Sequence, residues 1–178
     1  TVAIAESLTG GQLGQRITSV AGSSTYFLGG FLTYSDEVKT ALLGVAPEML
    51  RQHTAVSAEV AEQMAIGART RTAATYAIST TGEAGPESAT GAVVGTVYLG
   101  YATPEASGAV RLVMPGDRAR VGHEVPDCPL GRSLQFWPEA RRGQPRRHCG
   151  YALVLQTHQP RKGMRRAADE IDQHELVA

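Results

Sequence analysis

Along the first 116 residues, the repeat of hydrophobic and polar positions switches between the period typical of strands and the period typical of helices. Apolar runs of strand length lie at 1–5, 25–34, 76–82, 95–103 and 109–116. Between them, apolar residues recur at helical spacing, most clearly over 58–74, where the stripe consists of Val60, Ala61, Met64, Ala65 and Ala68. Strands that alternate with helices, followed by a hairpin across 104–108, predict an α/β fold, a three-layer sandwich with a mixed β-sheet.

Local signals predict where the helices begin and end. Residues that suit N-caps or a first helical turn precede four helical segments: Thr9, Ser35, Pro47 and Ser57. Gly44 fits a C-terminal stop for the helix that starts after Ser35. Gly29 and Gly30 interrupt the strand at 25–34, which predicts a bulge or a close backbone approach there.

The character of the chain changes at Val121. Neither the helical nor the strand period holds beyond it, and four of the five histidines lie there together with several prolines. We therefore expect a domain at 1–120 and an aberrant, poorly packed or disordered tail at 121–178.

Composition narrows the function classes. Seventeen basic and seventeen acidic residues give a formal net charge of zero, so no bulk field favours nucleic acid or an anionic membrane as a partner. The sequence has no run of eighteen apolar residues and no secretory signal pattern, and Cys128 and Cys149 form no disulfide framework, so the expected compartment is the cytoplasm. The chain starts at Thr1 in strand-like sequence without Met, which indicates a fragment or a processed chain.

A glycine-rich turn, TGGQLG at 9–14, precedes the first predicted helix. It matches neither the dinucleotide fingerprint nor a Walker A motif. One interpretation is a tight turn. The other is an anion site, in which backbone N–H groups around Gly10 and Gly11 point at a ligand from the helix N-terminus.

Two further segments suit a ligand. TTGEAGP at 80–86 ends a strand in a loop, and the hydroxyl of Thr81 or the amides around Gly82 suit a carbonyl oxygen or a phosphate. Arg118 of GDR follows a strand and suits bidentate contact with a phosphate. The alternatives are a loop without a ligand and a surface arginine that caps a turn.

A hydroxyl, a phenol and an amine flank the strand at 25–34: Ser24, Tyr34 and Lys39. A neutral lysine can deprotonate a serine when burial lowers the lysine pKa, and a tyrosine can relay that proton. On spacing alone, the favoured interpretation is that Ser24 is a turn serine, Tyr34 a strand aromatic and Lys39 a solvated lysine, because no S-x-x-K motif or nucleophile elbow surrounds Ser24. Ser7 is a rival nucleophile. No metal cluster or cofactor motif is evident; His148 and Cys149 lack the partners of a zinc site.

The motifs, in order, resemble one family. A-E-S-x-T-G-G, G-S-S-x-Y-F, G-G-x-x-x-Y-S-x-E-x-K, L-L-G-V, A-V-S, T-G-x-A-G-P, V-G-T-V-Y and G-D-R, over about 1–121, are similar to the CinA C-terminal domain. That is the nicotinamide-nucleotide amidohydrolase family. The resemblance implies hydrolysis of the carboxamide of nicotinamide mononucleotide to nicotinic acid mononucleotide and ammonia, without metal or cofactor.

The resemblance also implies roles for single residues. Ser24 would be the nucleophile, Lys39 its general base, and Tyr34 an assistant. Thr81 would contact the substrate or the oxyanion, and Arg118 would hold the substrate. The partner is then a small nucleotide, neither nucleic acid nor membrane, and a homo-oligomer is compatible with the sequence.

The sequence departs from the family in three places. Leu8 stands where the family usually has a cysteine, and the loop after Pro86 is shorter than usual. The sequence after Val121 resembles translation in a shifted frame, and such a tail would impair the enzyme. The competing hypotheses are a catalytically inactive nucleotide-binding or interaction module associated with competence or DNA damage and, ranked last, a nucleic-acid binder motivated only by the tail arginines.

Overall fold

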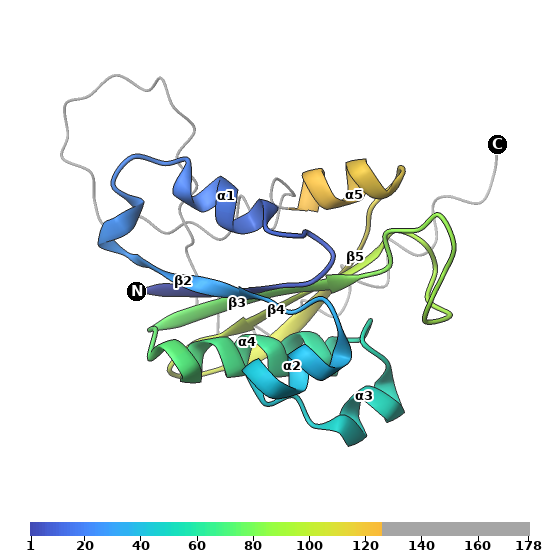
Figure 1. Cartoon of the computed structure of the whole chain (residues 1–178), viewed down its shortest axis with the longest axis horizontal. Coiled ribbons are helices and arrows are strands. Elements are labelled where there is room, and N and C mark those ends of the chain that lie inside the picture. The colour runs from blue at the N-terminus through green and yellow to red at the C-terminus, as the bar shows by residue number, and fades with distance from the viewer. Residues whose placement is uncertain (126–178) are drawn as a thin grey trace, which may run out of the picture.

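The computed structural model describes residues 1–125, which form one mixed sheet with helices on both faces (Figure 1). The strands are β1 (Val2–Glu6), β2 (Phe27–Leu32), β3 (Tyr76–Gly82), β4 (Thr96–Ala102) and β5 (Ser107–Val113). The helices are α1 (Gln12–Thr18), α2 (Asp36–Leu43), α3 (Pro47–His53), α4 (Ala58–Thr72) and α5 (Arg118–Glu124), and a 3-10 turn, η1 (Ser23–Thr25), precedes β2.

The five strands lie in the order β2-β1-β3-β4-β5. β1 pairs in parallel with both β2 and β3, whereas β3–β4 and β4–β5 are antiparallel. The carboxyl ends of the three parallel strands therefore lie together at one end of the sheet, where ligand sites of α/β proteins commonly lie. This arrangement confirms the predicted mixed sheet and the hairpin.

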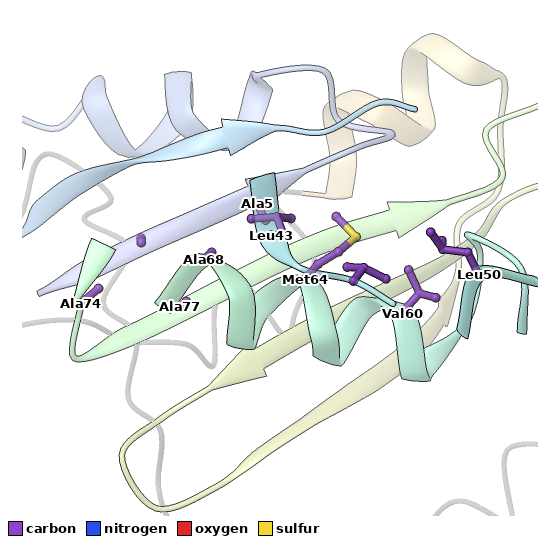
Figure 2. Close-up of a cluster of buried hydrophobic side chains, with 10 residues drawn as sticks. Ala5, Leu43, Leu50, Val60, Met64, Ala68, Ala74 and Ala77 are labelled. Carbon is purple, nitrogen blue, oxygen red and sulfur yellow. The ribbon is translucent and has the colours of Figure 1, made fainter. Parts of the chain in front are cut away.

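Helices α2, α3 and α4 cover one face of the sheet, and α1 and α5 cover the other (Figure 1). The predicted stripe of α4 is buried against the sheet, and Figure 2 shows Val60, Met64 and Ala68 pointing into this core. Helix α4 packs on all five strands, so the strands at both edges of the sheet share one core with it. The three-layer sandwich is thus confirmed.

The expected domain boundary at residue 120 is wrong for the residues just after it. Helix α5 crosses that boundary, and Val121 and Val125 are buried in a second apolar cluster with Val97 and Leu99. Two large apolar side chains suffice to anchor this turn of helix on the sheet. The rest of the predicted tail, 126–178, with Cys128, His148 and Cys149, lies outside the described residues.

Most predicted helix ends are confirmed. Ser35 and Ser57 accept hydrogen bonds from the backbone N–H groups of Val38 and Val60, and Gly44 ends α2 with φ 73°. The predicted cap at Thr9 is wrong: α1 starts after Gly11, and the Thr9 hydroxyl instead donates to the carboxylate of Glu6 at 2.6 Å.

Glycines allow two close approaches. The pairing of β1 with β2 shifts by one residue opposite Leu28, and Gly30 lies against Ile4 with no room for a Cβ, which confirms both expectations for the Gly29–Gly30 pair. On the other face, Gly67 of α4 lets the Leu43 carbonyl at the end of α2 come equally close. Among residues 1–125, no helix has the length and hydropathy needed to cross a membrane.

Candidate active site

Lys39 is the most deeply buried charged side chain at the carboxyl end of the sheet. The chain leaves β2, turns at the Ser35 cap and starts α2, so that Lys39 falls one turn into the helix on its buried side. Its side chain is 1% exposed. Lys39 Nζ donates to the Tyr34 backbone oxygen at 3.1 Å and lies 3.5 Å from Asp36 Oδ1.

Burial lowers the pKa of Lys39 below the ordinary lysine value of 10.5, and the Asp36 carboxylate opposes this shift. The ion pair with Asp36 is long, and Asp36 is 50% exposed, so solvent weakens its effect. The net direction favours the neutral amine, which is the form that can accept a proton.

Arg118 joins two loops at this end of the sheet. At the first turn of α5, its Nη1 donates to the Gly85 carbonyl at 2.7 Å, and its Nη2 donates to the Tyr34 hydroxyl. Tyr34 is 61% exposed, so its phenol and the bonded guanidinium are open to solvent. Tyr34 thus links Lys39, through its backbone oxygen, to Arg118, through its hydroxyl, from 84 residues away.

Thr81 and Ser7 lie at the same end of the sheet. Thr81 ends β3 and is 1% exposed, and its hydroxyl donates to the Ala55 carbonyl at 2.6 Å. This bond uses the only proton of the hydroxyl, so Thr81 can accept a hydrogen bond from a substrate but not donate one to an oxyanion while the bond holds. Ser7 follows β1, is 8% exposed, and its N–H donates to the Thr80 carbonyl.

Ser24 lies at the other end of β2. It is exposed within η1, which precedes the strand, whereas Tyr34 and Lys39 follow the strand. The six residues of β2 alone span about 20 Å at roughly 3.3 Å per residue. Within one chain, the structure therefore does not bring Ser24 to Lys39, in contrast to the expected serine–lysine pair.

The predicted anion site at Gly10 and Gly11 is filled by the chain itself. The N–H groups of Gly11, Leu13 and Gly14 all donate to the Glu6 carboxylate, at 2.8–3.1 Å, and Gly10 N–H donates to the Ser7 carbonyl. Glu6 is 3% exposed. Its negative charge occupies the α1 N-terminus, so these amides are not free for a substrate phosphate.

A second glutamate organises the loop after β3 in the same way. Glu83, 6% exposed, accepts from the N–H groups of Ala89 and Thr90 and from the Thr90 hydroxyl. Gly82, for which substrate contact was expected, packs against the backbone of Thr96 instead. Sequence reasoning missed both glutamates. Glu6 ends β1 and Glu83 directly follows β3, and each precedes a glycine-containing turn, a pattern that could have revealed them.

Known proteins share this fold and these motifs. The family model described as the CinA C-terminal domain matches residues 1–130. The chain is 56% identical over 122 residues to a CinA-like protein of Solibacter usitatus and 52% identical over 122 residues to one of Geobacter sp. strain M21. Each match covers 68% of this chain but only 29% and 30% of the relative. The chain therefore spans less than a third of the length of these curated relatives.

Solved structures agree with the sequence matches. The competence damage-inducible protein A (ComA) from Klebsiella pneumoniae has a TM-score of 0.67 and 32% identity, covering 69% of this chain and 77% of that chain. The competence/damage inducible protein CihA from Agrobacterium tumefaciens has a TM-score of 0.64 and 35% identity, covering 69% of this chain and 76% of that chain. The chain belongs to the CinA C-terminal domain family.

Proposed function

We propose that this domain hydrolyses the carboxamide of nicotinamide mononucleotide to nicotinic acid mononucleotide and ammonia. The observation that carries the proposal is the buried Lys39 amine, whose pKa is lowered by burial and which donates to the backbone oxygen of Tyr34, the residue whose hydroxyl bonds to Arg118. An amine with a lowered pKa suits a proton transfer, and the nearby guanidinium suits an anionic substrate. The family resemblance supplies the substrate and the reaction.

The reaction needs one nucleophile and one base. The first half requires Ser24 and Lys39 to come together, which a single chain does not achieve. There, the Ser24 hydroxyl attacks the carboxamide carbon while Lys39 accepts the hydroxyl proton, and Lys39 then protonates the departing nitrogen, which leaves as ammonia. In the second half, water attacks the resulting ester, Lys39 takes the proton of that water, and the ester bond breaks to return the proton to Ser24. The products are a carboxylate and ammonia, so one water is consumed per amide.

Arg118 is the best candidate for holding the substrate phosphate. The amides at the α1 N-terminus are already occupied by Glu6, so they do not compete for an anion. Arg118 is exposed, and within residues 1–125 its guanidinium bonds to two neutral oxygens, those of Gly85 and Tyr34. A guanidinium next to a phenol can bind a phosphate without losing either neighbour.

Ammonia release from nicotinamide mononucleotide tests the proposal. We expect Lys39→Met to lower kcat by about 10²–10⁴-fold, the usual contribution of a general base. Ser24→Ala should lower it by at least about 10³-fold, as for other lost nucleophiles. Arg118→Gln should chiefly raise KM.

Two other serines provide controls. Ser23 shares η1 with Ser24, and Ser7 is the rival nucleophile at the other end of the sheet. Ser23→Ala and Ser7→Ala should keep activity within a few-fold of the parent. Full activity in Ser24→Ala would exclude Ser24, and loss in Ser7→Ala alone would move the nucleophile to Ser7.

A nucleotide-binding module without turnover is the second candidate. One observation favours it: a single chain keeps Ser24 and Lys39 at opposite ends of β2. It predicts calorimetric binding of the mononucleotide to the parent chain with no ammonia produced. The amidohydrolase predicts both binding and product from the same preparation.

A further inference from the structure

Glu83 is a buried carboxylate next to the proposed site, and the reaction described above gives it no role. Its backbone continues the ladder between β3 and β4: the Glu83 N–H donates to the Thr96 carbonyl at 2.8 Å, and the Gly95 N–H donates to the Glu83 carbonyl at 2.7 Å. These two bonds close the base of the loop 84–94. The Glu83 side chain is therefore not needed to close the base and can act on the rest of the loop.

The Glu83 carboxylate binds the tip of this loop. Its Oε2 accepts hydrogen bonds from the N–H groups of Ala89 and Thr90, at 2.9 and 3.1 Å, and from the Thr90 hydroxyl at 3.1 Å. Because Glu83 is 6% exposed, solvent weakens these charge-assisted bonds little. The other charged residue of the loop, Glu87, is exposed. Glu83 is thus the carboxylate that folds the loop back on itself.

The same loop supplies a carbonyl that bonds to Arg118. Ala84, at the start of the loop, is buried in the apolar cluster that also contains Val121 of α5. Gly85 lies so close to Val94, at the end of the loop, that a Cβ on Gly85 would meet Val94 Cγ1 at 2.6 Å. In this position the Gly85 carbonyl accepts from Arg118 Nη1 at 2.7 Å. The contact between loop and guanidinium therefore depends on how the loop is folded.

We propose that Glu83 is a positioning residue for the substrate phosphate: by folding the loop 84–94, it holds the Gly85 carbonyl against Arg118 and so orients the guanidinium toward the phosphate. This inference rests on the proposed function, in which Arg118 binds that phosphate. The Gly85 carbonyl on Nη1 and the Tyr34 hydroxyl on Nη2 together fix the plane of the guanidinium. A side chain that is already ordered loses less conformational freedom on binding, so the phosphate is bound more tightly.

Calorimetric titration with two ligands tests this role without depending on turnover. Nicotinamide mononucleotide carries the phosphate, and nicotinamide riboside lacks it. In Glu83→Gln, the Kd for the mononucleotide should rise about tenfold, the value of one charge-assisted hydrogen bond, whereas the Kd for the riboside should change by less than about twofold. The ammonia assay should show the corresponding split, a higher KM for the mononucleotide at unchanged kcat.

Glu87→Gln is the matched control, because it removes the same charge from an exposed side chain of the same loop. If Glu83 acted only through its charge, its removal would reduce repulsion of the phosphate, and both variants would bind the mononucleotide more tightly. Tighter or unchanged mononucleotide binding in Glu83→Gln would therefore overturn the positioning role. Equal weakening of both ligands would overturn it as well, because it would indicate a general loss of structure.

A milder variant keeps the test usable if Glu83→Gln folds poorly. Thr90→Val removes one of the three bonds to Glu83 and should raise the mononucleotide Kd by about two- to threefold, again without affecting the riboside. An unchanged mononucleotide Kd in Thr90→Val would contradict the role of the folded loop.

A double-mutant cycle tests whether Glu83 acts through Arg118. In an Arg118→Gln background, Glu83→Gln should not weaken mononucleotide binding further, because both changes remove the same contact with the phosphate. Additive losses would overturn the inference. The expected Kd pattern in a chain that releases no ammonia would support the positioning role and overturn the amidohydrolase. Ammonia release with equal Kd values in the parent and Glu83→Gln would do the reverse, and a parent that binds neither ligand would overturn both.

Discussion

Glu6 and Lys39 are both buried charged side chains at the carboxyl end of the sheet, and their surroundings differ. The Glu6 carboxylate accepts four hydrogen bonds, three from backbone N–H groups and one from Thr9. The Lys39 ammonium, with three hydrogens to donate, has one carbonyl at 3.1 Å and one carboxylate at 3.5 Å. A fully bonded buried charge holds a turn in place, whereas an under-bonded one is ready to change its protonation state.

The largest effect on stability should come from Glu6→Gln. The amide keeps the shape but loses the charge, and its NH₂ group faces backbone donors at the α1 N-terminus. We expect the unfolding free energy to fall by about 3 kcal/mol, from the loss of several charge-assisted bonds. Urea denaturation followed by circular dichroism measures it. Glu87→Gln, at an exposed glutamate, should change the unfolding free energy little. Equal losses of stability in the two variants would show that the buried Glu6 carboxylate stabilises the fold no more than an exposed one.

Lys39→Met should act in the opposite direction on stability. Methionine fills similar volume without the cost of burying a weakly paired charge, so the unfolding free energy at pH 7 should rise by about 1–2 kcal/mol while activity is lost. The same urea experiment measures it. A loss of stability in Lys39→Met would show that Lys39 is structural, as Glu6 is.

The pH dependence of stability sharpens this point. Because the folded chain lowers the pKa of Lys39 below 10.5, the unfolded chain binds more protons between the lowered pKa and 10.5. Unfolding free energy of the parent should therefore rise with pH through that window. The advantage of Lys39→Met measured at pH 7 should shrink as the pH rises to 10.5. An advantage that stays constant from pH 7 to 10.5 would contradict a lowered pKa.

The smallest expected effect on stability concerns the hydroxyl of Thr96, which bonds to neither Glu6 nor Lys39. Thr96 Oγ1 is buried and, within the described residues, has no hydrogen-bond partner. Thr96→Val should leave the unfolding free energy unchanged or raise it by less than about 1 kcal/mol. Thr80→Val is the matched control, because it removes a bond to Thr9 and should cost about 1 kcal/mol. A clear loss in Thr96→Val would indicate an unrecognised role for that hydroxyl.

The local features of the fold could be predicted from the sequence. Ser35, Gly44 and Ser57 were correctly placed at helix ends because caps depend on neighbours within four residues. The apolar stripe of α4 was correct for the same reason. The family motifs placed the chain in the CinA C-terminal domain family, which the comparisons confirm.

The site was harder to foresee because it depends on strand direction and on long-range contacts. Ser24 and Tyr34 are ten positions apart in the sequence, but an extended strand lies between them, so they are far apart in space. Arg118 reaches Tyr34 across 84 residues, which no local pattern encodes. The burial of Glu6 against the N-terminus of α1 was also unexpected, because glutamates are rarely buried without a partner.

Gly67 shows how far the environment of Lys39 extends. This residue has no side chain, which lets the Leu43 carbonyl at the end of α2 lie close against α4. A single methyl group at that position would lift the helix that carries the amine and open a path for water. The reactivity of the lysine is therefore set in part by an atom that is missing from a different helix.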